Sequence, residues 1–367
     1  MGTILLGVFI LVSLINLLYF FSFFSFSHSG ITNKIHPEVP VSVIICAKNE
    51  EENLKNFLPS ILEQDYPNFE IIVINDASSD GTLEVIEDFQ KIDPRIQIVD
   101  VQNNEAFWAN KKYALTLGIK KAKNQHLLFT DADCAPQSKN WIREMSRNFQ
   151  PGNTIILGYG GYFQHTGSVL NKLIRFETLL TAIQYFSYAR LGSPYMGVGR
   201  NLAYTSTQFY ELKGFANHLH LRSGDDDLFV NEAATAENTA ICFHPDSITR
   251  SVPKTNFSEW FHQKRRHISV AGNYKTKHQA LLGAFYIFRV LFWLILGVLL
   301  ILQIYPRIVL SILGIKLITE AFVYFKAAKK LNESDVVWLF PLFDLLLIFL
   351  QLIIFISNLI SKPKHWK

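Results

Sequence analysis

Apolar residues form long uninterrupted runs at both ends of the sequence. Residues 1–33 contain no formally charged side chain, and Ile4–Phe26 is an almost continuous run of Leu, Ile, Val and Phe. About 20 apolar residues are enough to cross the hydrocarbon core of a bilayer. A cleaved signal peptide would have a basic start, a shorter apolar run and a small-residue cleavage site, and none of these is present. We therefore predict a membrane anchor over residues 1–33.

The last third of the chain repeats this pattern. Three apolar runs follow one another, at Val290–Tyr305, Ile308–Phe325 and Val336–Ser361. The middle run contains Lys316 and Glu320, which share a helical face at four-residue spacing and could neutralise each other. The alternative for this run is an amphipathic helix that lies in the membrane interface. We predict a C-terminal membrane region over residues 279–367 with two or three transmembrane helices.

Basic residues suggest which side of the membrane holds the middle of the chain. Those before the first C-terminal run are Lys264, Arg265, Arg266, Lys275 and Lys277. By the positive-inside tendency, they predict that residues 34–278 are cytoplasmic, in an integral protein of the plasma (inner) membrane. Lys326, Lys329 and Lys330 fit three further spans, whereas Lys362, Lys364 and Lys367 fit one span fewer with an interfacial segment. The number of C-terminal spans therefore stays open.

The middle of the chain, residues 34–278, has ordinary charge density and short apolar runs. Val41–Cys46 and Glu70–Asn75 are largely continuous β-branched runs, as expected for parallel strands covered on both faces. Further strands are expected at 97–101 and 126–130, and helices at 53–64, 82–92 and 111–121. This alternation predicts a doubly wound α/β sheet, with its ligand site at the carboxyl ends of the strands.

Polar residues follow three of the predicted strands at those ends. Glu50 comes shortly after the first strand, Asp76 after the second, and Asp131-Ala132-Asp133 after the fourth. In an extended loop Asp131 and Asp133 point the same way, and two hard oxygen ligands suit Mg²⁺ or Mn²⁺ together with phosphate oxygens. The alternative is a turn whose aspartates cap a helix expected over Pro136–Phe149.

Composition excludes several classes of protein. The net charge is only +4, from 35 basic and 31 acidic residues, so no global field would hold a nucleic acid. Cys46, Cys134 and Cys242 have no metal-finger spacing and are expected to be reduced thiols. The sequence contains neither a GxGxxG fingerprint nor a P-loop.

Two clusters of charge lie further along the chain. Gly224 is followed by Asp225, Asp226 and Asp227, whose mutual repulsion needs a cation or a raised pKa to relieve it, and such a site can supply a general base. The alternative is a solvated acidic helix start. The second cluster is Gln263–His267, in which Arg266 could bind a pyrophosphate. The alternative there is a basic patch against the membrane.

Across about residues 40–270 the chain resembles a membrane-bound glycosyltransferase of family 2, with the GT-A fold and its mixed α/β sheet. The segments that carry the resemblance, in the family's order, are VSVIICAKNEEENL, QDYPNFEIIVINDASSDGT, NKKYALTLGI, FTDADC, GVGRNLAY, SGDDDLF and QKRRH. The resemblance implies that Glu50 and Asp76 hold the nucleoside, with Lys111 near them or near the diphosphate. It also implies that Asp131 and Asp133 hold the metal and the diphosphate.

The downstream motifs acquire roles from the same resemblance. Asp226 would deprotonate the acceptor hydroxyl, with Asp225 as the alternative register. Gln263 and Arg266 belong to a QxxRW-like motif that binds the donor, and His267 stands where that motif has tryptophan. Gly199, Arg200 and Asn201 resemble the acceptor-side loop, and His267 is also expected on the acceptor side.

The resemblance therefore implies an inverting transfer of a hexosyl or N-acetylhexosaminyl group. The donor would be a nucleotide-diphosphate sugar, most often UDP-linked, and Mg²⁺ or Mn²⁺ would be required. Anchors at both ends favour a lipid or lipid-linked acceptor at the membrane. The alternatives are a processive polysaccharide synthase, with a saccharide acceptor, and a membrane-tethered scaffold that binds nucleotide sugars without turnover.

Overall fold

The computed structural model describes residues 1–30, 38–102, 111–221 and 223–361. The predicted end of the anchor at residue 33 and the lysines at 362, 364 and 367 lie outside these residues. The strands of the main sheet are β1 Val41–Ala47, β2 Phe69–Asp76, β3 Ile96–Val101, β4 His126–Asp131, β6 Ile155–Leu157, β8 Leu202–Thr205 and β9 Thr239–Ile241. Those of a smaller sheet are β5 Cys134–Pro136, β7 Gly160–Tyr162 and β10 Thr249–Ser251.

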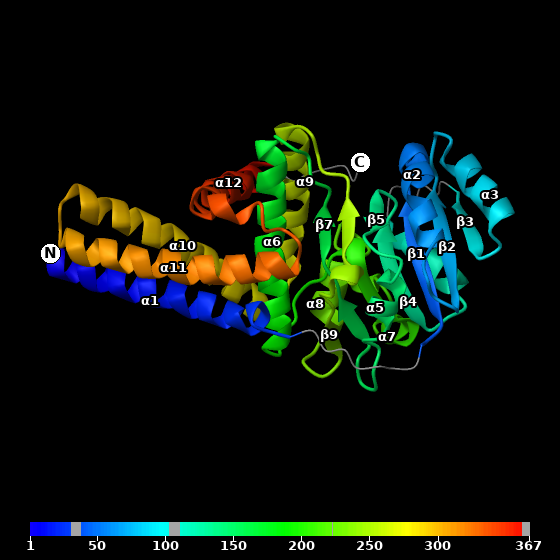
Figure 1. Cartoon of the computed structure of the whole chain (residues 1–367), viewed down its shortest axis with the longest axis horizontal. Coiled ribbons are helices and arrows are strands. Elements are labelled where there is room, and N and C mark those ends of the chain that lie inside the picture. Colours follow the sequence, from blue (N-terminus) through cyan, green and yellow to red (C-terminus); the bar gives the residue numbers. More distant parts are fainter. Residues whose placement is uncertain (31–37, 103–110, 222, 362–367) are drawn as a thin grey trace.

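The main sheet has seven strands in the order β3-β2-β1-β4-β8-β6-β9. The first four are parallel, β8 is antiparallel to β4 and β6, and β9 is parallel to β6. Every residue of β1 and β2 is buried, as their unbroken apolar sequences require when helices cover both faces. The structure thus confirms the predicted α/β class and the mixed sheet (Figure 1).

Helices of the α/β domain pack on this sheet through amphipathic faces. They are α2 Glu51–Leu62, α3 Thr82–Ile92, α4 Lys111–Lys121, α5 Trp141–Ser146, α7 Ser206–Glu211 and α8 Asp227–Ala233. On α4, Gly118 lies directly against Ile74 of β2, where a side chain would have no room. This close approach fixes α4 on the sheet and thereby places Lys111, its first residue, beside the end of β4.

The helix predicted over Pro136–Phe149 is largely wrong. Residues 134–136 form β5, which pairs antiparallel with β10, and only Trp141–Ser146 is α-helical. The physical reason is a long-range one, because β10 comes more than a hundred residues later and recruits the segment into the smaller sheet. The sequence of residues 134–136 alone therefore could not predict the pairing with β10.

Six further helices form the membrane-facing half, with bounds α1 Gly2–Ser27, α6 Val169–Arg190, α9 Phe257–Val270, α10 Thr276–Ile301, α11 Pro306–Lys330 and α12 Phe340–Ile360. Among the described residues, four helical stretches are long and apolar enough to cross a membrane: α1, α10, α11 and Val337–Ile360. Figure 1 shows α1, α10 and α11 extending away from the α/β domain, with α6 and α9 between the two halves.

The middle C-terminal run is part of this bundle. In α11 the Lys316 ammonium lies 2.5 Å from Glu320 Oε1, and both side chains are 1% exposed. The two residues therefore neutralise each other inside the bundle, as their spacing predicted. Helix α6 also has buried aromatic side chains, because Phe176, Tyr185 and Phe186 lie in the core that joins the two halves.

Candidate active site

A cavity of about 1060 Å³ connects the two halves of the molecule. It begins at the carboxyl ends of β1 and β4, passes α9, and reaches residues of α10 and α12. The predicted site residues that line it are Glu50, Lys111, Asp131, Asp133, Gly199, Asp225, Asp226, Gln263, Arg266 and His267. Residues from six separate stretches of the chain thus share one cavity.

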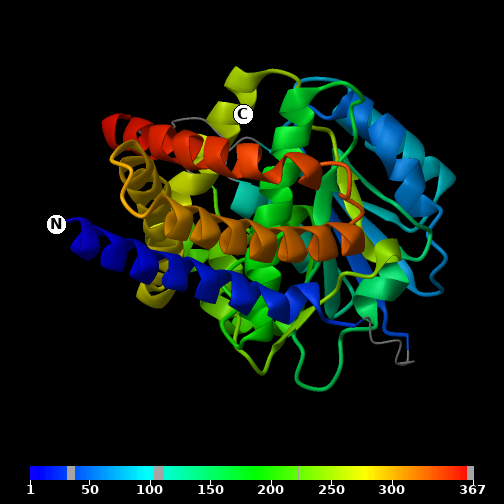
Figure 2. The same cartoon turned by 60° about the vertical axis from the view of Figure 1, so that its left-hand side comes forward.

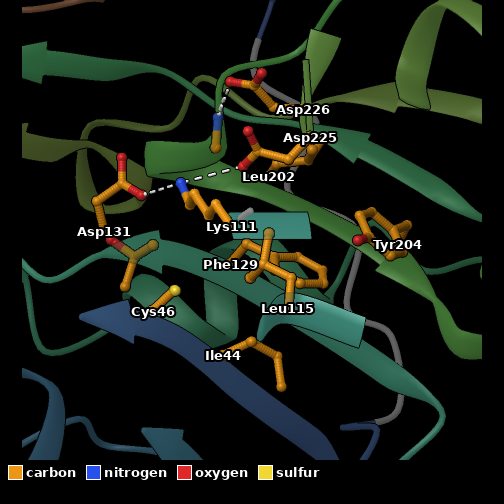
Figure 3. Close-up of a pocket in the computed structure, with 12 residues that line it drawn as sticks. Ile44, Cys46, Lys111, Leu115, Phe129, Asp131, Leu202, Tyr204, Asp225 and Asp226 are labelled. Atoms are coloured by element: carbon orange, nitrogen blue, oxygen red, sulfur yellow. Dashed lines mark hydrogen bonds and ion pairs between the residues drawn. The ribbon is translucent and has the colours of Figure 1, made fainter. Parts of the chain in front are cut away.

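At one end of the cavity a lysine lies between two carboxylates (Figure 3). Lys111 Nζ is 2.9 Å from Asp131 Oδ1 and 3.1 Å from Asp225 Oδ2. Burial acts to lower the pKa of Lys111, but the two negative charges outweigh it and raise the pKa well above its usual value. Lys111 therefore stays charged and joins the motif after β4 to the motif before α8.

The carboxylates of Asp131 and Asp133 converge on a common point. A ligand atom of each, together with the Cys134 thiol, lies within 4.8 Å of the others. Burial and the charge of Asp131 raise the pKa of Asp133, whose Oδ2 accepts a hydrogen bond of 3.0 Å from the Ser251 hydroxyl. A divalent cation would relieve this repulsion.

The donor set at this point fits a hard cation. Two carboxylates suit Mg²⁺ or Mn²⁺, which usually take their remaining ligands from water and phosphate. The Cys134 thiol donates a hydrogen bond of 3.3 Å to Asp133 Oδ1, and a thiol is a soft ligand that a hard cation does not favour. The two aspartates are therefore the residues that would hold the ion.

The three consecutive aspartates before α8 have different partners. Asp225 pairs with Lys111, as described above. Asp226 Oδ2 accepts a hydrogen bond of 2.7 Å from the Gly199 backbone N–H, and Asp227 Oδ2 accepts one of 2.6 Å from the Tyr274 hydroxyl. Burial and the charge of Asp225 raise the pKa of Asp226 to about 6, and burial with the charge of Asp226 raises that of Asp227 to about 8.

Of these aspartates, Asp226 has the properties of a general base. Its pKa is close to neutral pH, where a base is most effective. It lines the cavity, and its bond to Gly199 fixes the orientation of the carboxylate. Asp227 is instead held by Tyr274 and by the helix start, where its Oδ1 accepts from the Leu228 N–H.

Helix α9 carries the basic motif. Its residues contact α6, α12 and the cavity. Lys264 pairs with Glu177 of α6, and Arg265 contacts the end of α12. Arg266 and His267 line the cavity. Burial lowers the pKa of Arg266, while the nearby Asp225 and Asp131 carboxylates favour its charged form. Lys264 and Arg265 thus have protein partners, so the alternative of a basic patch on the membrane does not describe them.

Two predicted site residues lie behind the cavity wall. Asn201 is fully buried: its amide donates to the Tyr159 and Ser247 carbonyls and its oxygen accepts from Trp141 Nε1. This corrects its expected place on the acceptor side, because all of its hydrogen-bonding capacity supports the wall. Asp76 is 5% exposed and sits beneath Lys48, which donates to the Asp76 carbonyl at 2.9 Å and itself lines the cavity.

Arg200 and Tyr274 also line the cavity; Arg200 was named in the sequence only as part of the acceptor-side loop, and Tyr274 was not predicted. The Arg200 guanidinium lies 4.2 Å from the centre of the Tyr162 ring. Arg200 could have been found from the sequence, because it lies between Gly199 and Asn201 in the same motif. Tyr274 could not, because it lies far from Asp227 in the sequence and contacts it only in the folded chain.

Comparisons with known proteins bear on the family and the fold. Residues 42–201 match the model of the family described as glycosyl transferase family 2. A segment of 109 residues is 38% identical to a poly-beta-1,6-N-acetyl-D-glucosamine synthase of Staphylococcus epidermidis, covering 29% of this chain and 25% of that protein. Another of 124 residues is 35% identical to an uncharacterized glycosyltransferase of Haemophilus influenzae, covering 34% of this chain and 36% of that protein. The chain thus spans about a quarter to a third of these two relatives.

A solved structure resembles almost the whole chain. It is a mannosyltransferase of Pyrobaculum calidifontis in complex with GDP-Man and Mn²⁺, with a TM-score of 0.59 at 16% identity, and the match covers 90% of this chain and 97% of that one. At this identity the likeness concerns the fold. The matched family model includes the Asp131 motif and the Gly199 segment of the cavity. Residues 42–201 are therefore similar to glycosyl transferase family 2, and they lie in a fold with a GT-A-like mixed sheet.

Proposed function

We propose that this protein is an inverting glycosyltransferase that moves a sugar from a nucleotide-diphosphate donor, UDP-linked by preference, to a hydroxyl of a lipid or lipid-linked acceptor. The observation that carries the proposal is the single cavity shared by Asp131, Asp133 and Asp226. A pair of metal-ligating carboxylates and a base of suitable pKa lie together there, with Arg266 in the same cavity. The proposed transferred group is a hexosyl or N-acetylhexosaminyl group.

The donor half of the reaction belongs to the end of the cavity near β1 and β4. Asp131 and Asp133 would hold a Mg²⁺ or Mn²⁺ ion, which when bound neutralises charge on the donor diphosphate. Glu50 lines the same end, Asp76 supports it through Lys48, and Gln263 approaches it from α9. Similarity to a mannosyltransferase solved with GDP-Man and Mn²⁺ supports a nucleotide-sugar donor and a divalent ion.

The acceptor half belongs to Asp226. Its carboxylate takes the proton of the acceptor hydroxyl, and the acceptor oxygen forms a bond to C1 of the sugar while the bond from C1 to the diphosphate oxygen breaks. Attack from the face opposite the leaving group inverts the configuration at C1. Arg266 carries a fixed positive charge that stabilises the departing diphosphate.

The far end of the cavity favours an acceptor with an apolar part. It is lined by Tyr286 and Arg289 of α10 and by Gln351 and Phe355 of α12, helices that are apolar enough for a membrane. A lipid or lipid-linked hydroxyl could approach from this end while the donor enters from the other. We infer that the domain faces the cytoplasm, because basic residues are concentrated before α10.

Product analysis tests this proposal. The full chain, reconstituted in nanodiscs with Mn²⁺ and a lipid extract, is incubated with radiolabelled UDP- and GDP-sugars, and organic and aqueous products are separated. We expect label in the organic phase with wild type, and none after Asp131→Asn or without the divalent ion. Asp88→Asn, an exposed change on α3, is the matched control.

Other results would change the assignment. A second candidate, a processive polysaccharide synthase, is favoured by the similarity to the Staphylococcus epidermidis synthase, and it predicts a long water-soluble polymer instead. Donor binding without transfer or hydrolysis across the whole panel would favour a non-enzymatic scaffold.

A further inference from the structure

Both ends of α12 are attached to the side of the molecule that holds the α/β domain. At its start, the turn after α11 carries Glu333, which is fully buried and pairs with Arg250 of β10. Arg175 of α6 donates to Glu333 Oε2 at 2.8 Å and to both carboxylate oxygens of Asp335, at 2.8 and 2.6 Å. The beginning of α12 is therefore fixed to β10 and α6.

The end of α12 is held by α9. Arg265 Nε donates to Asn358 Oδ1 at 3.0 Å, and the Asn358 amide donates back to the Arg265 carbonyl at 2.9 Å. Arg265 also donates to the Ser357 carbonyl at 3.0 Å. Because α9 in turn pairs with α6 through Lys264 and Glu177, this end too lies on the side of the α/β domain.

The other three apolar helices have their ends on opposite sides. At the far end, Gly2 of α1 lies against Ile304 in the turn between α10 and α11. At the near end, Lys330 of α11 donates to the Phe26 carbonyl of α1 at 2.8 Å. In Figure 1 these three helices extend along the long axis whereas α12 is strongly foreshortened, and the turned view of Figure 2 shows α12 lengthwise.

The side chains of α12 separate into an inner polar stripe and an outer apolar stripe. Asp344, Gln351 and Asn358 recur every seven residues on the inner side. Asp344 pairs with Arg289 of α10, Gln351 lines the cavity, and Asn358 bonds to Arg265. The outer stripe has exposed fractions from 38% to 61%, at Leu342, Leu346, Phe349, Ile353 and Ile356.

We propose that α12 does not cross the bilayer but lies in its plane, on the side of the α/β domain, with its outer stripe against lipid hydrocarbon. The helix has 21 residues, which would span about 30 Å if it stood upright, yet both ends are bound to one side. The crossing helices α10 and α11 also expose apolar side chains, among them Leu294 and Ile315. The cavity is thus separated from the lipid by the thickness of one helix, at Gln351 and Phe355.

Spin-label depth measurements distinguish an in-plane helix from a crossing one. Nitroxides are placed one at a time on the outer stripe, through Leu342→Cys, Phe349→Cys and Ile356→Cys, in the full chain in nanodiscs. Depth is read from relaxation by oxygen and by a water-soluble nickel complex. The matched controls are Ile308→Cys, Ile315→Cys and Phe322→Cys on α11, which are also exposed, apolar and seven residues apart.

Seven residues of helix rise about 10 Å, so a crossing helix changes depth by about that amount between successive labels. We expect this step on α11 and depths within about 5 Å of one another on α12. Steps of about 10 Å on α12 would overturn the proposal. So would α12 labels that neither reagent reaches and that couple between molecules, because a second copy would then cover the stripe. Wild type treated with the label measures any background from the three buried cysteines.

Discussion

In the turn between α11 and α12 one buried carboxylate meets two arginines, whereas in the cavity three consecutive aspartates meet one lysine. Glu333 is fully buried, bonded by Arg175 and Arg250, and it also accepts a hydrogen bond of 3.0 Å from the Tyr159 hydroxyl. In the part of the chain that the structure describes, the aspartate run at the start of α8 forms an ion pair between Asp225 and Lys111. Both clusters are enclosed by protein, but the first has two ion-paired arginines for its buried carboxylate, whereas the second has one ion-paired lysine for three described carboxylates.

This difference is the reason for treating the first cluster as structural and the second as the proposed catalytic site. A buried ion pair that is fully hydrogen-bonded holds elements in one arrangement, and its loss leaves uncompensated charge. A surplus of buried carboxylates raises pKa values, as it does for Asp226 and Asp227, and such raised values are typical of functional sites. The predictions below change one cluster at a time.

The largest effect is expected from Asp226→Asn. The amide cannot accept the acceptor proton, so kcat should fall by about 10²–10⁴-fold, the usual contribution of a general base. Binding of the donor with Mn²⁺ should change little, because Asp226 lies apart from the metal-ligating pair. The measurement is the rate of sugar transfer beside donor titration by calorimetry.

Asp225→Asn tests whether Asp225, rather than Asp226, is the general base. It removes the partner of Lys111 and should weaken donor binding more than it lowers kcat. Full transfer activity in Asp226→Asn together with a loss of kcat in Asp225→Asn would move the base assignment to Asp225.

The next effect is on stability, from Glu333→Ala. Arg175 is 1% and Arg250 5% exposed, so removing their shared carboxylate leaves buried positive charge and should cost about 3–5 kcal/mol. Transfer activity per folded molecule should be retained below the unfolding temperature, since Glu333 does not line the cavity. The measurement is thermal unfolding in detergent, followed by circular dichroism, of Glu333→Ala beside wild type.

Asp335→Asn is the matched control for this change. Asp335 pairs with the same arginine, but its side chain is 45% exposed, and an exposed pair contributes about 0–1 kcal/mol. Equal losses of stability in Glu333→Ala and Asp335→Asn would contradict the contrast between the two clusters.

Features that depend on local sequence could be predicted. Unbroken apolar runs located β1 and β2, and the helix predicted over residues 111–121 has those bounds in α4. The aspartates after β4 and before α8 were identified because each cluster is contiguous in sequence.

Features that depend on partners distant in sequence could not be predicted. The inward position of Asn201 requires Trp141, and β5 exists because β10 pairs with it. The stretch Val337–Ile360 has a mean hydropathy of 2.6, the same as that of α1, so hydropathy carries no information about the different attachment of α12. That attachment comes from single arginines on α6, α9 and β10.

The smallest expected effect is a pH dependence that follows from the raised pKa of Asp226. As pH rises, activity should increase and stability should decrease. Asp226 acts as a base only when ionised, so kcat/KM at saturating Mn²⁺ should fall about tenfold per pH unit below its pKa of about 6. Because the folded pKa is raised above the unfolded value, the folded state binds the extra proton. Its contribution to stability is complete below the unfolded pKa of about 4 and is lost as pH rises through about 6. The residual activity of Asp226→Asn should lack the acidic limb. An acidic limb that persists in this variant would assign the titration to another group.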